Sequence, residues 1–311
     1  MMLAWILTLP LNLFKGTWAD YVERGNAKQG TGDYEGALAD YSKAIELEPA
    51  NVIPYQYRAR ARLDHKDWSG AGADYTKIIE LQPYGAPNYF NRGCVKSAQG
   101  DFAAAIADYT KAVELEPTLV RAYYNRAYAQ KNQGDPEGAI ADYTEAIRLD
   151  PNYADAHFNR GLLRYDLQAF REALEDFRKS LALKLSGDYT DFVHFRIWLI
   201  RARMGEPEAA TAELQAYLAK RQPEEPDAWL YKIGSFLVGQ LSEPELFSGT
   251  KNPDKIIEAG RICEACFYAG SKWLMAGNKT IAGDYFRRSI ASGITHFHEY
   301  CSAMAELELL K

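Results

Sequence analysis

The chain has 311 residues, of which 47% are hydrophobic and 25% are charged, as is typical of a folded protein. Its formal net charge is −6 and it contains no long basic run, so it lacks the positive surface that nucleic-acid binding requires. Four cysteines in a chain of this length are too few to form a disulfide framework.

The first 17 residues form an apolar segment. Its core, MMLAWILTLPLNLF, is too short to cross a bilayer as a helix, so no direct membrane span is predicted. The length suits the hydrophobic region of a signal peptide, and Thr17 and Ala19 supply small residues for cleavage, although no Lys or Arg precedes the run. A signal peptide favours an exported or periplasmic protein over a cytoplasmic one. The alternative is an N-terminal helix that packs on the next one.

One sequence motif then recurs every 34 residues. ADYSKAIELEP covers residues 39–49, and related copies begin at positions 73, 107, 141 and 175. The period divides the chain into five units, namely 18–51, 52–85, 86–119, 120–153 and 154–187. A fixed period of this length indicates stacked supersecondary units, none of which can bury its apolar face alone.

Each unit reads as a pair of helices. In the third unit we expect helices over residues 87–99 and 102–116, with Gly100-Asp101 as the turn and Pro117 as the stop. Gly93 on the first helix and Tyr109 on the second lie on the faces that would meet. A small residue there lets the helices cross closely, and the aromatic ring fills the space above the crossing.

The repeated positions resemble the tetratricopeptide repeat (TPR). In the fourth unit they are Tyr123, Ala127, Gly134, Asp135, Ala139, Tyr143, Ala146 and Pro151. The resemblance implies an all-α fold, a right-handed TPR α-solenoid of stacked antiparallel helix pairs, with five units over residues 18–187.

The repeat then degenerates. Residues 188–259 read as a helical hairpin, which turns at Gly205-Glu206-Pro207, followed by linking helices. Residues 260–311 return to TPR-like spacing, with Gly270 and Phe286 at repeat positions, and end in a helix that we expect to cap the stack. The order of these pieces resembles bacterial TPR lipoproteins of the NlpI type over residues 190–310. That resemblance implies an envelope adaptor that docks other proteins, among them proteases and cell-wall hydrolases.

Two charged sets share the repeat period. The first helices carry Arg24, Arg58, Arg92, Arg126 and Arg160, and the second helices carry Asp40, Asp74, Asp108, Asp142 and Asp176. In an antiparallel hairpin each arginine lies near the level of its own aspartate. We therefore expect a ladder of ion pairs with a structural role.

A third periodic set points to binding. It comprises Asn91, Asn125 and Asn159, with Phe90, Tyr124 and Phe158 beside them and Tyr128, Lys131 and Tyr165 farther along. An amide can donate and accept at once, so such a ladder could hold an extended peptide backbone, while aromatic neighbours add apolar area. The set resembles the asparagine ladder of O-GlcNAc transferase TPR superhelices. The alternative is that duplication copied a solvated helix residue.

The sequence shows no recognisable catalytic motif and no cofactor-binding motif, so neither an enzyme nor a cofactor is predicted. The best metal candidate is Cys263 and Cys266, with Cys301 and His298 near them if the last helix folds back. We expect these thiols to pack as small apolar residues instead, and we predict no metal.

The leading hypothesis is a non-enzymatic scaffold or adaptor that binds an extended peptide or partner helix in the concave TPR groove. An alternative is an assembly protein of the bacterial cell envelope whose main role is self-association, for example as a homodimer. A further alternative is an enzyme carried by residues 188–311, although that segment lacks any recognisable acid–base or nucleophile pair.

Overall fold

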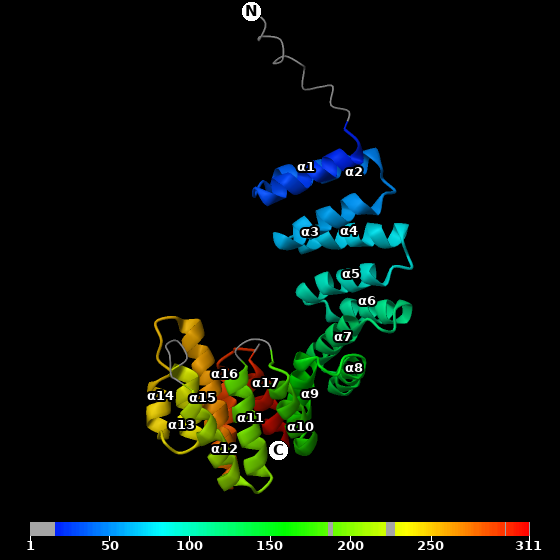
Figure 1. Cartoon of the computed structure of the whole chain (residues 1–311). Helices are drawn as coiled ribbons and strands as arrows, with labels where there is room; N and C mark the ends of the chain where they lie inside the picture. Colours follow the sequence, from blue (N-terminus) through cyan, green and yellow to red (C-terminus); the bar gives the residue numbers. More distant parts are fainter. Residues whose placement is uncertain (1–15, 186–188, 222–227, 296, 311) are drawn as a thin grey trace, which may run out of the picture. The chain divides into compact units, whose positions relative to one another are not determined.

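The computed structural model describes residues 16–185, 189–221, 228–295 and 297–310, and throughout these ranges the regular structure is α-helical (Figure 1). The apolar segment assigned to a signal peptide or N-terminal helix therefore lies almost entirely outside the described residues. The chain divides into two compact units, Met1–Asp142 and Tyr143–Lys311, which are treated separately below.

From residue 16 onward, where the structure describes it, the first unit contains seven complete helices and the start of an eighth, arranged as consecutive antiparallel pairs (Figure 1). Neighbouring first helices also touch each other, α1 against α3 and α5 against α7. The helices are α1 (Trp18–Gly30), α2 (Tyr34–Leu47), α3 (Val52–Asp64), α4 (Trp68–Leu81), α5 (Ala86–Ala98), α6 (Phe102–Leu115), α7 (Val120–Gln133) and α8 (Pro136–Leu149), which continues past the boundary at Asp142.

The turn between the helices of a repeat follows from two residues. Gly32 and Gly100 have φ angles of 82° and 80°, a left-handed conformation that glycine adopts without a Cβ clash. The next residue, Asp33 or Asp101, is the N-cap of α2 or α6, and its carboxylate accepts a hydrogen bond from the backbone N–H three residues later. The Gly-Asp pair thus ends one helix and starts the next.

Small residues are required where the two helices of a pair cross. A Cβ atom on Gly25 would lie 2.6 Å from Cε1 of Tyr41, and one on Gly93 would lie 2.7 Å from Cε1 of Tyr109. Both tyrosine rings are buried, so they occupy the space that the glycines leave. The core of the first unit consists of several separate clusters along the stack, as expected when each repeat packs only on its neighbours.

The second unit continues from Tyr143 through the remaining helices. They are α9 (Ala154–Asp166), α10 (Phe170–Ala182), α11 (Thr190–Arg203), α12 (Pro207–Lys220), α13 (Ala228–Leu237), α14 (Glu243–Ser248), α15 (Lys255–Met275), α16 (Lys279–Ala291) and α17 (His298–Leu309). The expected turn at Gly205 joins α11 to α12, and α15 and α16 form the TPR-like terminal hairpin.

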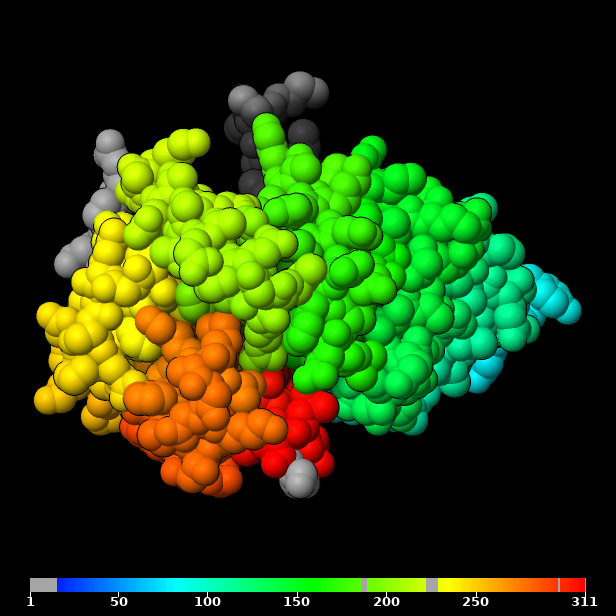
Figure 2. Space-filling model, turned by 90° about the horizontal axis from the view of Figure 1, so that it is seen from below, coloured from blue at the N-terminus to red at the C-terminus, as the bar shows by residue number. Residues whose placement is uncertain are grey.

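One continuous core holds the second unit together, from Phe158 on α9 to Ala303 on α17. The fifth repeat, α9 and α10, therefore shares its core with the helices that follow it. The final helix packs on α16 and also contacts α9. In Figure 2 the red atoms of α17 lie beside the orange atoms of α16. This return of the last helix to α9 makes the second unit different from a simple stack.

Candidate functional site

All five expected ion pairs between first-helix arginines and second-helix aspartates are present. They are Arg24–Asp40, Arg58–Asp74, Arg92–Asp108, Arg126–Asp142 and Arg160–Asp176. The aspartate side chains are only 2–9% exposed. In most repeats a second cation, four residues after the arginine, reaches the same carboxylate; Lys96 Nζ, for example, lies 3.1 Å from Asp108 Oδ2. The hydrogen bond from Arg24 holds the pKa of Asp40 below its ordinary value.

The same arginines also join successive repeats, which the sequence reasoning missed. In the first unit Arg58 Nη1 donates to Ser42 Oγ at 2.8 Å and Arg126 Nη1 donates to Thr110 Oγ1 at 3.1 Å, so each guanidinium links its own hairpin to the preceding second helix. The sequence signal is the hydroxyl residue after ADY, which lies 16 positions before the next arginine. Arg24 is 51% exposed, whereas Arg58 and Arg126 are 17% and 16% exposed.

Some residues of the predicted groove line an open recess in the first unit. It has a volume of about 430 Å³ and lies between α5, α6 and α7. Its lining comprises Cys94, Ser97, Ala98, Tyr109, Tyr124, Asn125 and Tyr128. The Asn125 amide Nδ2 donates to Cys94 Sγ at 3.6 Å, and sulfur is a weak acceptor. A peptide carbonyl would be a stronger partner for that amide. Asn91 and Lys131 are partly exposed on α5 and α7, outside the lining.

Three of the predicted groove residues are buried packing residues. Phe90 is 7% exposed and packs on Tyr109. In the second unit Phe158 and Tyr165 are 3% and 2% exposed and belong to the core. The positions before Asn91 and Asn159 therefore face neighbouring helices, and the three buried side chains offer no surface for a peptide.

Asn159 is also committed to a local contact. Its Nδ2 donates to the carbonyl oxygen of Asp155, one turn earlier on α9, at 2.8 Å. A side-chain bond of this kind is a common arrangement for a polar residue within a helix. Asn125, by contrast, lines a recess of its own unit.

A second recess in the first unit was not predicted. It has a volume of about 740 Å³ and lies between α1 and α3. Its lining comprises Asn26, Gln29, Gly30, Ile53, Gln56, Tyr57, Arg60 and Asp64. The repeat register supplies the signal that was overlooked: Tyr57 stands 34 residues before Asn91 and thus occupies the asparagine position of its own repeat. Tyr57 is 40% exposed.

The second unit buries a charged cluster. Arg196 is fully buried, and its guanidinium lies 4.5–4.8 Å from the ring centres of Tyr165, Phe192 and Phe267. Its Nη2 lies 3.9 Å from Oε1 of Glu299, which also accepts a hydrogen bond from Tyr268 at 3.0 Å. The aromatic rings compensate part of the desolvation of the cation.

Nearby, Trp229 Nε1 donates to Glu264 Oε2 at 2.6 Å. Burial, with a smaller contribution from the Glu299 charge, raises the pKa of Glu264 to about 8. Burial in the folded protein thus favours the protonated form of this carboxyl group.

Two thiols of the second unit are buried. Cys263 and Cys266 are buried on α15, and burial raises the pKa of Cys266 to about 11, which disfavours a reactive thiolate at neutral pH. Within the described ranges, no group of three or more potential metal ligands is close enough to hold an ion. None of the helices in those ranges combines the length and apolar character needed to cross a bilayer.

Comparison with known proteins agrees with this geometry. A tetratricopeptide repeat family profile matches residues 22–86, and a TPR repeat profile matches residues 93–134 and 132–168. A crystal structure of MamA is 25% identical, with a TM-score of 0.50, and the match covers 51% of this chain and 94% of MamA.

Two further solved structures share the fold. MamA residues 41 to the end, from Desulfovibrio magneticus RS-1, is 22% identical, with a TM-score of 0.51, 55% of this chain covered and 97% of the other. PilF of Pseudomonas aeruginosa is 16% identical, with a TM-score of 0.52, 66% of this chain covered and 93% of the other. The chain therefore carries tetratricopeptide repeats between residues 22 and 168, and its described residues have an all-α TPR solenoid fold.

Proposed function

We propose that the protein is a non-enzymatic interaction scaffold that binds an extended peptide on the first-helix face of its first unit. This face is defined by the side chains that line the two recesses, one between α1 and α3 and the other between α5, α6 and α7. The observation that carries the proposal is that each recess combines side-chain amides with a tyrosine that is at least 40% exposed, Tyr57 in one and Tyr128 in the other.

The chemistry of the face suits a peptide backbone. The amides of Asn26, Gln56 and Asn125 can each donate to a peptide carbonyl and accept from a peptide N–H. Exposed aromatic rings and Ile53, which is 39% exposed, supply apolar area for alternate side chains. Because the ladder of ion pairs fixes the helices beforehand, the ordering cost of binding falls mainly on the peptide.

The test is selection from a random peptide library displayed on phage, followed by affinity measurement on the enriched peptides. The groove variant carries Tyr57→Ala, Asn125→Ala and Tyr128→Ala. The control variant carries Lys77→Ala and Lys111→Ala, which remove exposed lysines from second helices of the same unit. We expect the groove variant to bind at least roughly tenfold more weakly and the control to bind like the wild type. Equal binding by the groove variant, or no enriched peptide at all, would refute the proposal.

Self-association is the alternative function, and one feature of the second unit favours it. Ile256 and Ile257 are 72% and 47% exposed at the start of α15, beside an apolar recess that also includes Trp229 and Phe297. Light scattering of the purified protein would detect a dimer. If self-association is the main role, Ile256→Asp with Ile257→Asp should yield a monomer. The resemblance to NlpI-type envelope adaptors over residues 190–310 remains a prediction about the compartment.

A further inference from the structure

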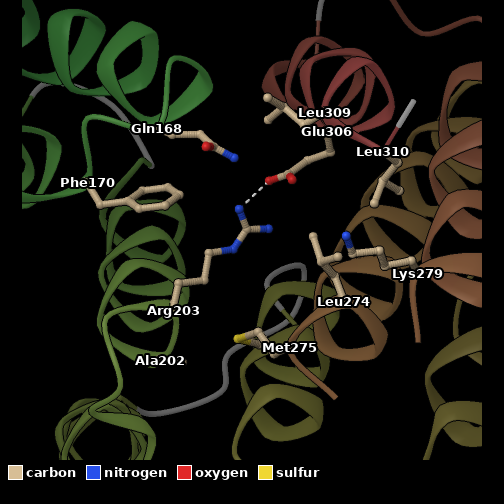
Figure 3. A pocket seen from close by; sticks show the side chains of 10 residues that line it. All are labelled: Gln168, Phe170, Ala202, Arg203, Leu274, Met275, Lys279, Glu306, Leu309 and Leu310. Carbon is tan, nitrogen blue, oxygen red and sulfur yellow. Dashed lines mark ion pairs between the residues drawn. The ribbon is translucent and has the colours of Figure 1, made fainter. Parts of the chain in front are cut away.

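A pocket in the second unit brings together residues from four separate parts of the chain (Figure 3). Its volume is about 380 Å³, within the range of small-molecule sites. The turn between α9 and α10, the end of α11, the turn between α15 and α16, and the end of α17 form its walls. The lining residues are Gln168, Phe170, Ala202, Arg203, Leu274, Met275, Lys279, Glu306, Leu309 and Leu310.

Arg203 is the central polar group of this pocket. Its side chain is 10% exposed, and its Nη1 lies 2.5 Å from Oε1 of Glu306. Its Nε and Nη2 have no hydrogen-bond partner among the residues that the structure describes. The guanidinium also lies 5.5 Å from the ring centres of Tyr165 and Phe170, so aromatic rings and not water surround it. Buried N–H donors without an acceptor are unfavourable, and because both atoms are shielded from solvent, an oxygen ligand would satisfy Nη2 only once the guanidinium turns toward the pocket.

The charged residues of the pocket favour one sign of charge on such a ligand. Arg203 and Glu306 neutralise each other, and the ammonium of Lys279 adds one positive charge at the first residue of α16. Lys279 forms no ion pair among the described residues. In Figure 3 the Gln168 amide and the Lys279 ammonium both point toward the space beside the Arg203 guanidinium. A net charge of +1 and converging N–H donors favour a monoanion.

The remaining walls specify what the anion is attached to. Phe170, Leu274, Met275, Leu309 and Leu310 provide an apolar lining next to the polar groups. A hydrated inorganic anion would leave this lining unused, whereas a carboxylate on an apolar group would cover it.

We propose that this pocket binds a carboxylate carried by a short apolar group, with the carboxylate on Arg203 Nη2 and Lys279. The carboxylate belongs either to a free aliphatic acid or to the C-terminal residue of a peptide that ends in an apolar side chain. Both have the same chemistry at the pocket. The site lies wholly within the second unit and does not depend on the peptide groove proposed for the first.

Met275 offers a local probe of binding, because the chain has only five methionines. With ¹³C-methyl methionine in the full-length protein, the Met275 signal is assigned by Met275→Leu, and Met304, which is 48% exposed outside the lining, serves as an internal reference. The probes are hexanoate and the tripeptide acetyl-Ala-Ala-Leu with a free carboxylate. Their controls are hexanamide and the same tripeptide with a C-terminal amide.

We expect at least one acid probe to shift the Met275 signal in a saturable way, with the matching amide at least roughly tenfold weaker. Saturation by hexanoate alone identifies a free acid as the source, and saturation by the tripeptide identifies a peptide C-terminus. Lys279→Ala should weaken binding roughly fivefold. Lys255→Ala is the matched control, because Lys255 is also the first residue of a helix in this unit but lies outside the pocket.

Arg203→Lys keeps a positive charge opposite Glu306 but removes the second donor, so binding should weaken even if the fold is retained. Three results would overturn the proposal: no Met275 shift with either acid at 10 mM (about the weakest binding worth considering), equal binding of acid and amide, or equal effects of Lys279→Ala and Lys255→Ala.

Discussion

The ion-pair ladder predicts a large difference between two acidic residues on one helix, α6. Asp108 is 6% exposed and faces two cations, Arg92 at 2.7 Å and Lys96 at 3.1 Å. Asp108→Asn keeps the size of the side chain but leaves both cations without a counter-charge. Breaking a buried pair costs about 3–5 kcal/mol. Because Arg92 and Lys96 are 18% and 28% exposed and can turn partly to water, we expect a smaller loss of about 2–3 kcal/mol.

Glu114→Gln on the same helix is the matched control. Glu114 pairs with Lys111 at 3.0 Å, but the two side chains are 57% and 46% exposed, so its loss should cost less than about 0.5 kcal/mol. Asp40→Asn should lower the stability by an intermediate amount, about 1 kcal/mol, because its partner Arg24 is 51% exposed. Repeat proteins unfold in parts, so the measurement is amide hydrogen exchange of α5 and α6 together with the urea midpoint. If Asp108→Asn and Glu114→Gln have equal effects, the ladder does not stabilise the stack.

Three further changes test other features of the structure. Lys66→Gly should stabilise the first unit by about 0.5–1 kcal/mol, because Lys66 has a φ of 60° in a turn where the first, third and fourth repeats use glycine; an unchanged urea midpoint would contradict this. Gly93→Ala should lower stability by about 1–3 kcal/mol, since the new Cβ would lie 2.7 Å from Tyr109, and a neutral result would show that the ring can move.

Glu264→Gln should become increasingly more stable than the wild type as the pH rises from 4.5 to 8. The raised pKa keeps the folded wild type protonated where the unfolded chain ionises, so the wild type loses up to about 1.4 kcal/mol per pH unit over that window. Urea midpoints of both proteins at pH 5, 6, 7 and 8 measure this change in relative stability. A difference between the two midpoints that stays constant with pH would contradict the prediction.

The periodic part of the fold was predictable because its determinants are local. In the third repeat, α5 and α6 span 86–98 and 102–115, close to the expected 87–99 and 102–116, because the Gly100-Asp101 turn and Pro117 mark their ends. The ion pairs were also predictable, because a constant spacing of 16 residues in an antiparallel hairpin fixes which levels meet. The repeat period fixes the relative positions of residues within one repeat. The helix boundaries and the ion pairs depend only on those positions.

Exposure of the periodic positions was less predictable. A position that repeats every 34 residues has the same helix phase in every copy, yet its surroundings depend on the neighbouring helix. Phe158 illustrates this, because it packs against Tyr189, Phe192 and His298, which lie outside the five-fold pattern. In the first unit Tyr57, at an asparagine position, lines the recess between α1 and α3. A groove therefore has to be defined repeat by repeat from the residues that are exposed.

The pocket in the second unit could not be predicted from the repeat pattern. Arg203, near the end of α11, reads in sequence as a cation that complements the helix dipole. Its partner Glu306 comes about a hundred residues later, and the two meet because α17 returns to α9, where Ser302 donates to Asp166 and Tyr165 to Glu306. In a stack each repeat contacts only its neighbours, so a pocket with unsatisfied donors can form where the chain departs from that rule. The two sites that we propose follow that division, with an extended ligand on the regular repeats and a small anionic group in the pocket beside the returning helix.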